Sequence, residues 1–275
     1  AGFLAAKKFN QVMFGNHPYS KLKDGDLVSL NNISADDLIN FVANKFARDN
    51  MVVSIVGDVD ESSAQKIFAK LTEKLPETSK TSKVVDFTAY PQTAPQKVNI
   101  NNPQTKIVFA SKGVKRSDDK FFALYLLSHI LGGDGFQAHL VKEVREKRGL
   151  AYYIGTDVQN MDHADLLVGT VGTTAAGEQE VIGLIKTVYS GLQNKGVTKQ
   201  ELDDAKAFLT GSFALNLDKN EKLAAYLSMM QQENLGMDYL QKRNDYINSV
   251  TLEQVNSVAK ELLAADSLVF ISAGQ

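Results

Sequence analysis

The chain carries an internal repeat near its two ends. Residues 30–57, LNNISADDLINFVANKFARDNMVVSIVG, align without a gap with residues 247–274, INSVTLEQVNSVAKELLAADSLVFISAG, at an offset of 217 (30 to 247). In each copy a hydroxyl residue, Ser34 or Thr251, is followed three residues later by a side chain able to reach back to it, which is the spacing of a helix-capping box. Sequence duplication of this kind indicates two related structural units.

Both copies continue with the same pattern of a helix and a strand. Apolar residues recur three and four positions apart, which predicts an amphipathic helix with one buried face. These positions are Leu38, Phe41, Val42 and Phe46 in the first copy and Val255, Val258, Ala259 and Leu263 in the second. A polar break and a short apolar run follow, at 51–56 and at 268–273, and predict a buried strand closed by glycine. We therefore expect two homologous domains that each end in this unit.

A polar, proline-bearing segment separates the two domains. The stretch PETSKTSKVVDFTAYPQTAPQ, which follows Leu75, has the composition of a linker. We assign residues 1–76 to the C-terminal part of the first domain, 77–95 to the linker and 96–275 to the second domain. A second domain that starts near residue 95 would have a counterpart starting about 120 residues before residue 1. The sequence thus predicts one and a half domains.

The second domain combines clustered strand patterns with a long run of helices. Strands are predicted at 97–101, 105–111, 151–158 and 164–172, helices at 118–131 and from Phe136 to Lys147, and further helical pieces between 176 and 264. This order is typical of α+β architecture with a largely antiparallel sheet. We expect a mostly antiparallel sheet flanked by helices, in a duplicated domain with one partial and one complete copy.

The composition excludes several functional classes. The net charge is only -2 and both signs are mixed along the chain, so we expect no nucleic-acid partner. The absence of cysteine excludes disulfides and thiolate chemistry, which fits the cytoplasm and is compatible with a bacterial periplasm. No apolar stretch has the length of a membrane span, and any targeting segment would lie upstream. The compartment stays open.

Four motifs, in order along the chain, resemble those of one family. They are FGNHPYSKLKDG, NMVVSIVGDVD, LGGDGF and HLVKEVREKRGLAYY. Together they are similar to the pitrilysin/insulinase-type zinc metallopeptidases, which include mitochondrial processing peptidase and related core subunits of a respiratory complex. The resemblance covers essentially the whole chain. It implies two homologous α/β domains in tandem which, with a second pair from a homologous subunit in a homo- or heterodimer, form a clamshell chamber around an unfolded peptide substrate.

The zinc box of this family, H-x-x-E-H with a downstream Glu, is absent. The four histidines are His17, His129, His139 and His163, and no two of them are four residues apart. In the family the box lies early in the first domain, so the resemblance implies no metal in this chain and zinc in a missing N-terminal segment or a partner subunit. The counterpart of the box here is a strongly apolar stretch that keeps only one histidine of the box, His129. We expect this stretch to be a core helix. The chain therefore resembles the inactive second domain plus the tail of the first, with no catalytic residue of its own.

Arg145 and Tyr152 are the candidate substrate-binding residues. Active members of the family carry an Arg and a Tyr seven residues apart in the second domain, in the same R-x-K-x-G-L-x-Y context, and both reach the active site. A guanidinium can donate to a substrate carbonyl, and a phenol can donate to the oxygen that becomes negative as water adds to a peptide bond. The alternative is a solvated arginine at a helix C-terminus and a tyrosine packed in a strand.

Three glycines precede this pair. Gly132, Gly133 and Gly135 lack the spacing of a phosphate loop and the Lys-Ser/Thr that would follow it, and predict a tight turn between two helices. After the turn the family carries an S-x-L segment, whereas this chain has Gln-Ala-His-Leu at 137–140. The resemblance therefore does not extend to a substrate contact in that segment.

Two functions follow from these features. The leading interpretation is the substrate-binding, non-catalytic portion of a zinc metalloendopeptidase that hydrolyses peptides. The alternative is a catalytically inactive scaffold or peptide-binding subunit of the same family. Arg145 and Tyr152 favour the first, because a scaffold needs no oxyanion donor. A third interpretation, an unrelated ligand-binding α+β module, requires the four ordered motifs to be coincidental.

Overall fold

The computed structural model describes residues 1–135 and 137–275, which form two compact units. The first unit comprises residues 1–23, 85–208 and 244–275, and the second comprises residues 24–84 and 209–243. Phe136, the expected first residue of a helix, lies outside the described residues. Within the two described ranges, no helix combines the length and the apolar character that crossing a membrane requires.

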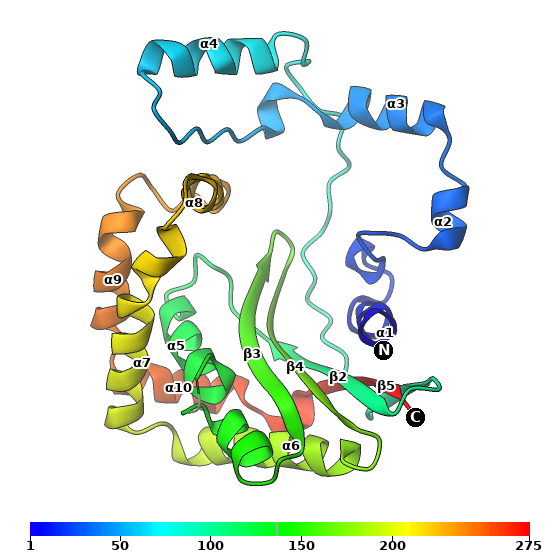
Figure 1. Ribbon diagram of the computed structural model, residues 1–275, viewed down its shortest axis with the longest axis vertical. Helices are drawn as coiled ribbons and strands as arrows, with labels where there is room; N and C mark the ends of the chain where they lie inside the picture. The colour runs from blue at the N-terminus through cyan, green and yellow to red at the C-terminus, as the bar shows by residue number, and fades with distance from the viewer. Residues whose placement is uncertain (136) are drawn as a thin grey trace. The chain divides into compact units, whose positions relative to one another are not determined.

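The first unit is built on a five-stranded mixed sheet (Figure 1). Its strands are β1 Gln96–Asn99, β2 Gln104–Lys112, β3 Ala151–Met161, β4 Ala164–Thr174 and β5 Val269–Gly274, in the order β1-β5-β2-β4-β3. Three pairs are antiparallel and only β1 runs parallel to its neighbour, β5. The prediction of an α+β fold with a mostly antiparallel sheet is confirmed.

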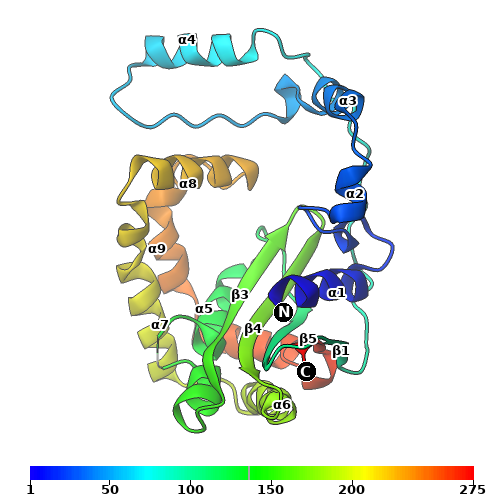
Figure 2. The same cartoon turned by 45° about the vertical axis from the view of Figure 1, so that its right-hand side comes forward.

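Helices pack on both faces of this sheet because the central strands β2 and β5 are apolar and buried along nearly continuous runs, and successive side chains of a strand point to opposite faces. On one face α1 (Gly2–Phe14) buries Phe9 and Met13 against a cluster that includes Val108 (Figure 2). The next residue along β2, Phe109, points to the other face, where its ring lies 5.8 Å from that of Phe270 and 6.3 Å from that of Tyr189. Three helices that contact one another or the sheet cover this face: α5 Phe121–Gly132, α6 Glu178–Lys195 and α10 Leu252–Leu262.

The second unit is largely helical. Its elements are α2 Leu27–Asn31, α3 Ala35–Lys45, η2 Arg48–Asn50, α4 Glu61–Thr72, η4 Phe213–Leu217 and α8 Asn220–Gln232. Two further helices, α7 Lys199–Gly211 and α9 Tyr239–Ser249, have residues in both units. On α8, the Gln231 side chain donates to Ser54 Oγ at 2.9 Å and to the Val53 carbonyl at 3.3 Å.

The helical part of the internal repeat is reproduced element by element. α3 and α10 each follow a capping box, formed by Ser34 and Asp37 in one copy and by Thr251 and Gln254 in the other. Each helix is followed by one turn of 3-10 helix, η2 in the first copy and η5 (Ala265–Ser267) in the second. The start and end of every one of these elements differ by the same offset of 217 (35 to 252, 50 to 267). The local sequence therefore determines the caps and helices of both copies.

The strand predicted at 51–56 is wrong. The equivalent residues of the second copy form β5, whose backbone is hydrogen-bonded to β1 on one side and to β2 on the other. Residues 51–56 form no strand, because no other described segment pairs with them. A strand is stable only where its N–H and C=O groups find a neighbouring strand.

The buried face predicted for α3 is wrong for the same reason. The apolar side chains of α3 and of the residue after it are exposed, namely Leu38, Phe41, Val42 and Phe46, whereas their counterparts Val255, Val258, Ala259 and Leu263 are buried. α10 packs against α5 and α6, and no described part of the second unit plays that role for α3. The amphipathic pattern predicts the helix correctly but does not supply the elements that cover it.

Candidate functional site

Arg145 and Tyr152 lie side by side in the first unit. The Arg145 guanidinium carbon is 5.3 Å from the centroid of the Tyr152 ring, within the range of a cation–π contact. Arg145 Nε also faces Glu146 Oε1 at 3.4 Å. Tyr152 is 87% exposed, so its hydroxyl can be approached from solvent. The structure thus brings together the two residues that the sequence singled out.

A π-helix carries Arg145. The residues Val141–Glu146 (η3) form this wider turn, in which the Lys147 N–H donates to the carbonyl of Lys142, five residues earlier, at 3.0 Å. Val141 and Val144 are buried and hold the segment to the body of the unit. A π-turn accommodates one residue more than an α-helix of the same length, and such turns occur frequently at functional sites. The helix predicted at 136–147 is present here in that modified form.

A β-bulge carries Tyr152. Ala151 pairs with Thr173 and Tyr153 pairs with Gly172, so Tyr152 has no partner on β4. An unpaired extra residue bends the strand and changes the direction of its side chain. β3 is the last strand of the sheet, and both Tyr152 and Tyr153 are exposed. The extra residue of the π-helix sets the position of Arg145, and the extra residue of the β-bulge sets the position of Tyr152.

A small cavity lies beside the pair. Its volume is about 170 Å³, and its walls are the glycine turn 132–135, Val141 and Arg145 of the helical segment, and residues 153–155 of β3. Tyr153 therefore belongs to the site, although its place in an apolar, aromatic run gave no signal for this role.

The glycine turn allows α5 to end close to β3. A Cβ atom on Gly132 would lie 2.9 Å from the Thr156 nitrogen, and one on Gly133 would lie 2.7 Å from the Cα of His129. Gly135 has φ +107°, a conformation that favours glycine. Gly132 and Gly133 thus line the cavity where a side chain would clash, and Gly135 lines it where the backbone conformation favours glycine.

The histidines of the chain do not suit a zinc ion. In the described ranges, no group of three or more His, Cys, Asp or Glu side chains is placed to hold a metal. His129 stacks on Phe208 with 4.7 Å between ring centroids, and burial lowers its pKa. The ring of His17 lies 2.9 Å from the Val85 carbonyl through Nε2 and accepts from the Tyr19 N–H through Nδ1. Both rings are therefore engaged in packing or hydrogen bonds rather than aimed at a shared site.

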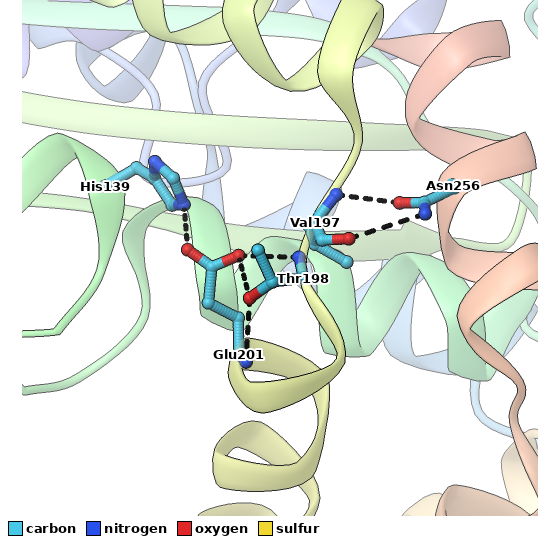
Figure 3. A network of polar contacts seen from close by, with 5 residues as sticks. All are labelled: His139, Val197, Thr198, Glu201 and Asn256. Atoms are coloured by element: carbon cyan, nitrogen blue, oxygen red, sulfur yellow. Dashed lines mark hydrogen bonds and ion pairs between the residues drawn. The ribbon is translucent and has the colours of Figure 1, made fainter.

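The other two histidines face carboxylates that lie far away in sequence. His163 Nδ1 is 3.0 Å from Asp86 Oδ1, and Asp86 Oδ2 accepts from Lys115 Nζ at 2.8 Å. His139 Nε2 faces Glu201 Oε1 (Figure 3), and the two atoms are 2.7 Å apart. No sequence signal could have paired these residues, since neither histidine is near its acid along the chain.

Comparison with known proteins assigns the family. The statistical model of the family described as "Peptidase M16 inactive domain" matches residues 32–209, which is more than half of the chain. The chain belongs to the peptidase M16 inactive-domain family. The resemblance found in the four sequence motifs is confirmed, and this M16 chain includes the family's non-catalytic region.

Three M16-related proteins are among those most similar to the chain. A crystal structure of a peptidase M16 inactive domain from Pseudomonas fluorescens is 32% identical, with a TM-score of 0.91, over 99% of this chain and 65% of that one. The "Uncharacterized zinc protease YmxG" of Bacillus subtilis is 24% identical over 96% of this chain and 64% of its own. The "Non-peptidase homolog YmxG" of Helicobacter pylori is 26% identical over 98% and 62%. The chain thus spans less than two thirds of the length of these relatives.

Proposed function

We propose that this chain is the substrate-binding, non-catalytic portion of an M16 zinc metalloendopeptidase that hydrolyses peptides inside a clamshell chamber. Membership of the inactive-domain family supports the non-catalytic role. The observation that carries substrate binding is the contact of the half-buried Arg145 with the exposed Tyr152, beside a cavity on the edge strand of the sheet. The zinc would be held by an N-terminal segment or by a homologous subunit of a homo- or heterodimer.

Each residue of the pair has a separate task in this proposal. The Arg145 guanidinium donates to a carbonyl of the bound peptide and fixes its position. The Tyr152 hydroxyl donates to the oxygen of the scissile carbonyl, which becomes more negative as water adds, so that this hydrogen bond is strongest in the transition state. The nearby glycine turn leaves space for the backbone of the peptide.

The proposal includes a duplicated domain. Residues 1–76 would be the end of a first domain, 77–95 the linker, and 96–275 the second domain. The exposed apolar face of α3 and the unpaired residues 51–56 support this, since their counterparts in the second copy are covered. A preceding segment with the fold of the second domain would supply one parallel and one antiparallel strand to 51–56, as β1 and β2 do for β5.

The alternative is a catalytically inactive scaffold or peptide-binding subunit. The Helicobacter pylori relative, which is named a non-peptidase homolog, favours it. The two functions differ in one assay on the parent polypeptide with its complete first domain. Chelator-sensitive hydrolysis of an unfolded protein would support the peptidase, whereas binding without hydrolysis would support the scaffold.

The binding role can be tested on the 275-residue chain itself. The probe is fluorescein-labelled, reduced and carboxymethylated α-lactalbumin, a polypeptide that cannot fold, and binding is measured by fluorescence anisotropy. We expect Arg145→Gln to weaken binding by about tenfold, because a hydrogen bond to a charged group contributes roughly 1.5–3 kcal/mol. Tyr152→Phe should weaken it by about threefold to tenfold.

A matched control separates this effect from a general loss of charge. Arg48→Gln removes an arginine from the second unit, where it forms an exposed ion pair with Glu77 at 3.5 Å, and should leave the affinity unchanged. The proposal is wrong if the unfolded probe does not bind, or if Arg145→Gln and Arg48→Gln have the same effect.

A further inference from the structure

We infer that His139 and Glu201 are positioning residues that hold the π-helix in register and so keep Arg145 against Tyr152. The inference rests on the proposed function only for its consequence, which is peptide affinity. Two segments of the first unit are in contact here, since His139 Nε2 lies 2.7 Å from Glu201 Oε1. Among the described residues after the glycine turn, His139 is the first in a helix, and Glu201 lies in the first turn of α7.

Hydrogen bonds hold the start of α7, and with it Glu201, in place (Figure 3). The second carboxylate oxygen of Glu201 accepts from the Thr198 N–H at 2.8 Å and from its hydroxyl at 2.9 Å, while the Glu201 N–H donates to the Thr198 hydroxyl at 3.2 Å. One residue earlier, the Val197 N–H donates to Asn256 Oδ1 of α10 at 2.7 Å. Glu201 is therefore held by a capping box that is itself tied to a core helix.

The Glu201 carboxylate stays charged in this setting. Burial raises the pKa of Glu201, but the hydrogen bonds from the Thr198 N–H and hydroxyl, together with the nearby His139, outweigh it and leave the pKa below its ordinary value. A charged acceptor makes a stronger hydrogen bond than a neutral one.

The other end of the Arg145 segment is also fixed. The Leu150 carbonyl accepts from the Thr173 hydroxyl at 2.7 Å, and the Leu150 N–H donates to the Val144 carbonyl at 3.0 Å. On the other side of the π-helix, the 2.7 Å contact between His139 Nε2 and Glu201 Oε1 ties the first end to α7. The segment is thus tied at both ends.

Two fixed ends explain why the segment is a π-helix. The wider turn takes up one residue more than an α-helix would between the same two anchors. If the His139 anchor is released, the extra residue can move into the glycine turn and the segment can relax to an α-helix. A shift by one residue rotates a side chain by about 100° around the helix axis, which would carry Arg145 away from Tyr152.

The test compares histidine variants by anisotropy with the same unfolded α-lactalbumin probe. We expect His139→Ala to weaken binding by about fivefold to tenfold, close to the effect of Arg145→Gln. His139→Gln, whose amide can still donate to Glu201, should recover most of the affinity. His163→Ala is the matched control, because His163 is exposed to the same degree (30% against 32%) and also faces a carboxylate, Asp86. It should have no effect.

A double variant shows whether His139 acts through Arg145. In the Arg145→Gln background, His139→Ala should cause no further loss of affinity. An equal loss in both backgrounds, or no loss in the wild-type background while Arg145→Gln does weaken binding, would overturn the inference and leave the proposed function intact.

NMR supplies a readout that does not depend on the peptide. We expect the nuclear Overhauser contact between the Arg145 side chain and the Tyr152 ring to disappear in His139→Ala and to persist in His139→Gln and His163→Ala. If it persists in His139→Ala, the inference is wrong even if binding is real. If Arg145→Gln has no effect on binding but the contact disappears, only the proposed function fails. Should His139→Ala not fold, His139→Asn, which is too short to reach Glu201, takes its place.

Discussion

Phe41 and Val258 hold equivalent positions on α3 and α10, yet Phe41 is 55% exposed and Val258 only 2%. The two helices have the same length and begin with the same kind of capping box. The difference comes from their neighbours, because α10 packs against α5 and α6 while α3 has no such cover among the described residues. The same helix therefore contributes differently to stability in the two copies.

A matched pair of substitutions measures this difference. Val255→Ala should lower the free energy of unfolding by about 2 kcal/mol, because it leaves a cavity in a buried site. Leu38→Ala removes more carbon atoms from the equivalent exposed position and should change stability by less than about 0.5 kcal/mol. Urea unfolding followed by circular dichroism checks both. Equal losses would mean that the α3 face is covered in solution.

Amide hydrogen exchange should distinguish the two copies of the apolar run. The amides of β5 that are bonded to β1 or β2 should exchange at least about a hundredfold more slowly than those of 52–56, which lie in no described ladder. Mass spectrometry of peptic fragments resolves the two regions. Slow exchange at 52–56 would show that a second copy of the chain or some other strand pairs with them.

Alanine substitution should have opposite effects on stability at two glycines. Gly183→Ala, at an exposed position of α6 where a Cβ meets nothing within 4 Å, should stabilise the protein by about 0.5–1 kcal/mol. Gly132→Ala, whose Cβ would press on the Thr156 backbone, should destabilise it by about 1–3 kcal/mol. Thermal unfolding provides the measurement, and a stabilising Gly132→Ala would contradict the close approach of α5 to β3.

The Asp86 carboxyl should titrate at an unusually low pH. The hydrogen bond from Lys115, together with that from His163, lowers the pKa of the Asp86 carboxyl from 3.8 to about 2. Because the pKa is lower in the folded state, the stability that Asp86 contributes is fully present above pH 3.8 and is lost as the pH falls through about 2. Carboxyl-carbon NMR gives the midpoint directly. Lys115→Ala should move it up towards 3.8, and a midpoint already there in the wild type would disprove the contact.

Tyr152 can be tested for catalysis in the complete, zinc-bearing parent. Tyr152→Phe should lower turnover by about a hundredfold or more, since loss of one oxyanion donor typically costs that much. The melting temperature should hardly change, because the hydroxyl is exposed and supports no packing. Peptide hydrolysis under saturating conditions checks this, and unchanged turnover removes the proposed role.

Much of the structure of residues 96–275 could be predicted from local pattern. The strands near 97–101, 105–111, 151–158 and 164–172 and the helices around them are present with boundaries shifted by a few residues. Alternation and helical spacing carry that information because these residues face a core that the chain itself supplies. The prediction of a strand at 51–56 failed because no described segment pairs with these residues.

The sequence indicated which residues form the candidate site but not how they are arranged. The motif around Arg145 and Tyr152 identified the pair, but neither the π-turn nor the bulge that places them has a local signature, because each depends on anchors elsewhere in the fold. The contacts of His139 and His163 with carboxylates could not be predicted for the same reason, since their partners Glu201 and Asp86 come from distant segments.

The sequence by itself determined the repeat, the capped helices, the α+β class and the family, because these depend on local spacing and on motifs. Tertiary structure decided which copy of the repeat is buried, whether an apolar run becomes a strand, and where the Arg145 guanidinium points. Hydrogen bonds between strands and the burial of apolar faces need partners from other parts of the chain. A sequence pattern states that such a partner is needed, and only the folded chain shows whether it is there.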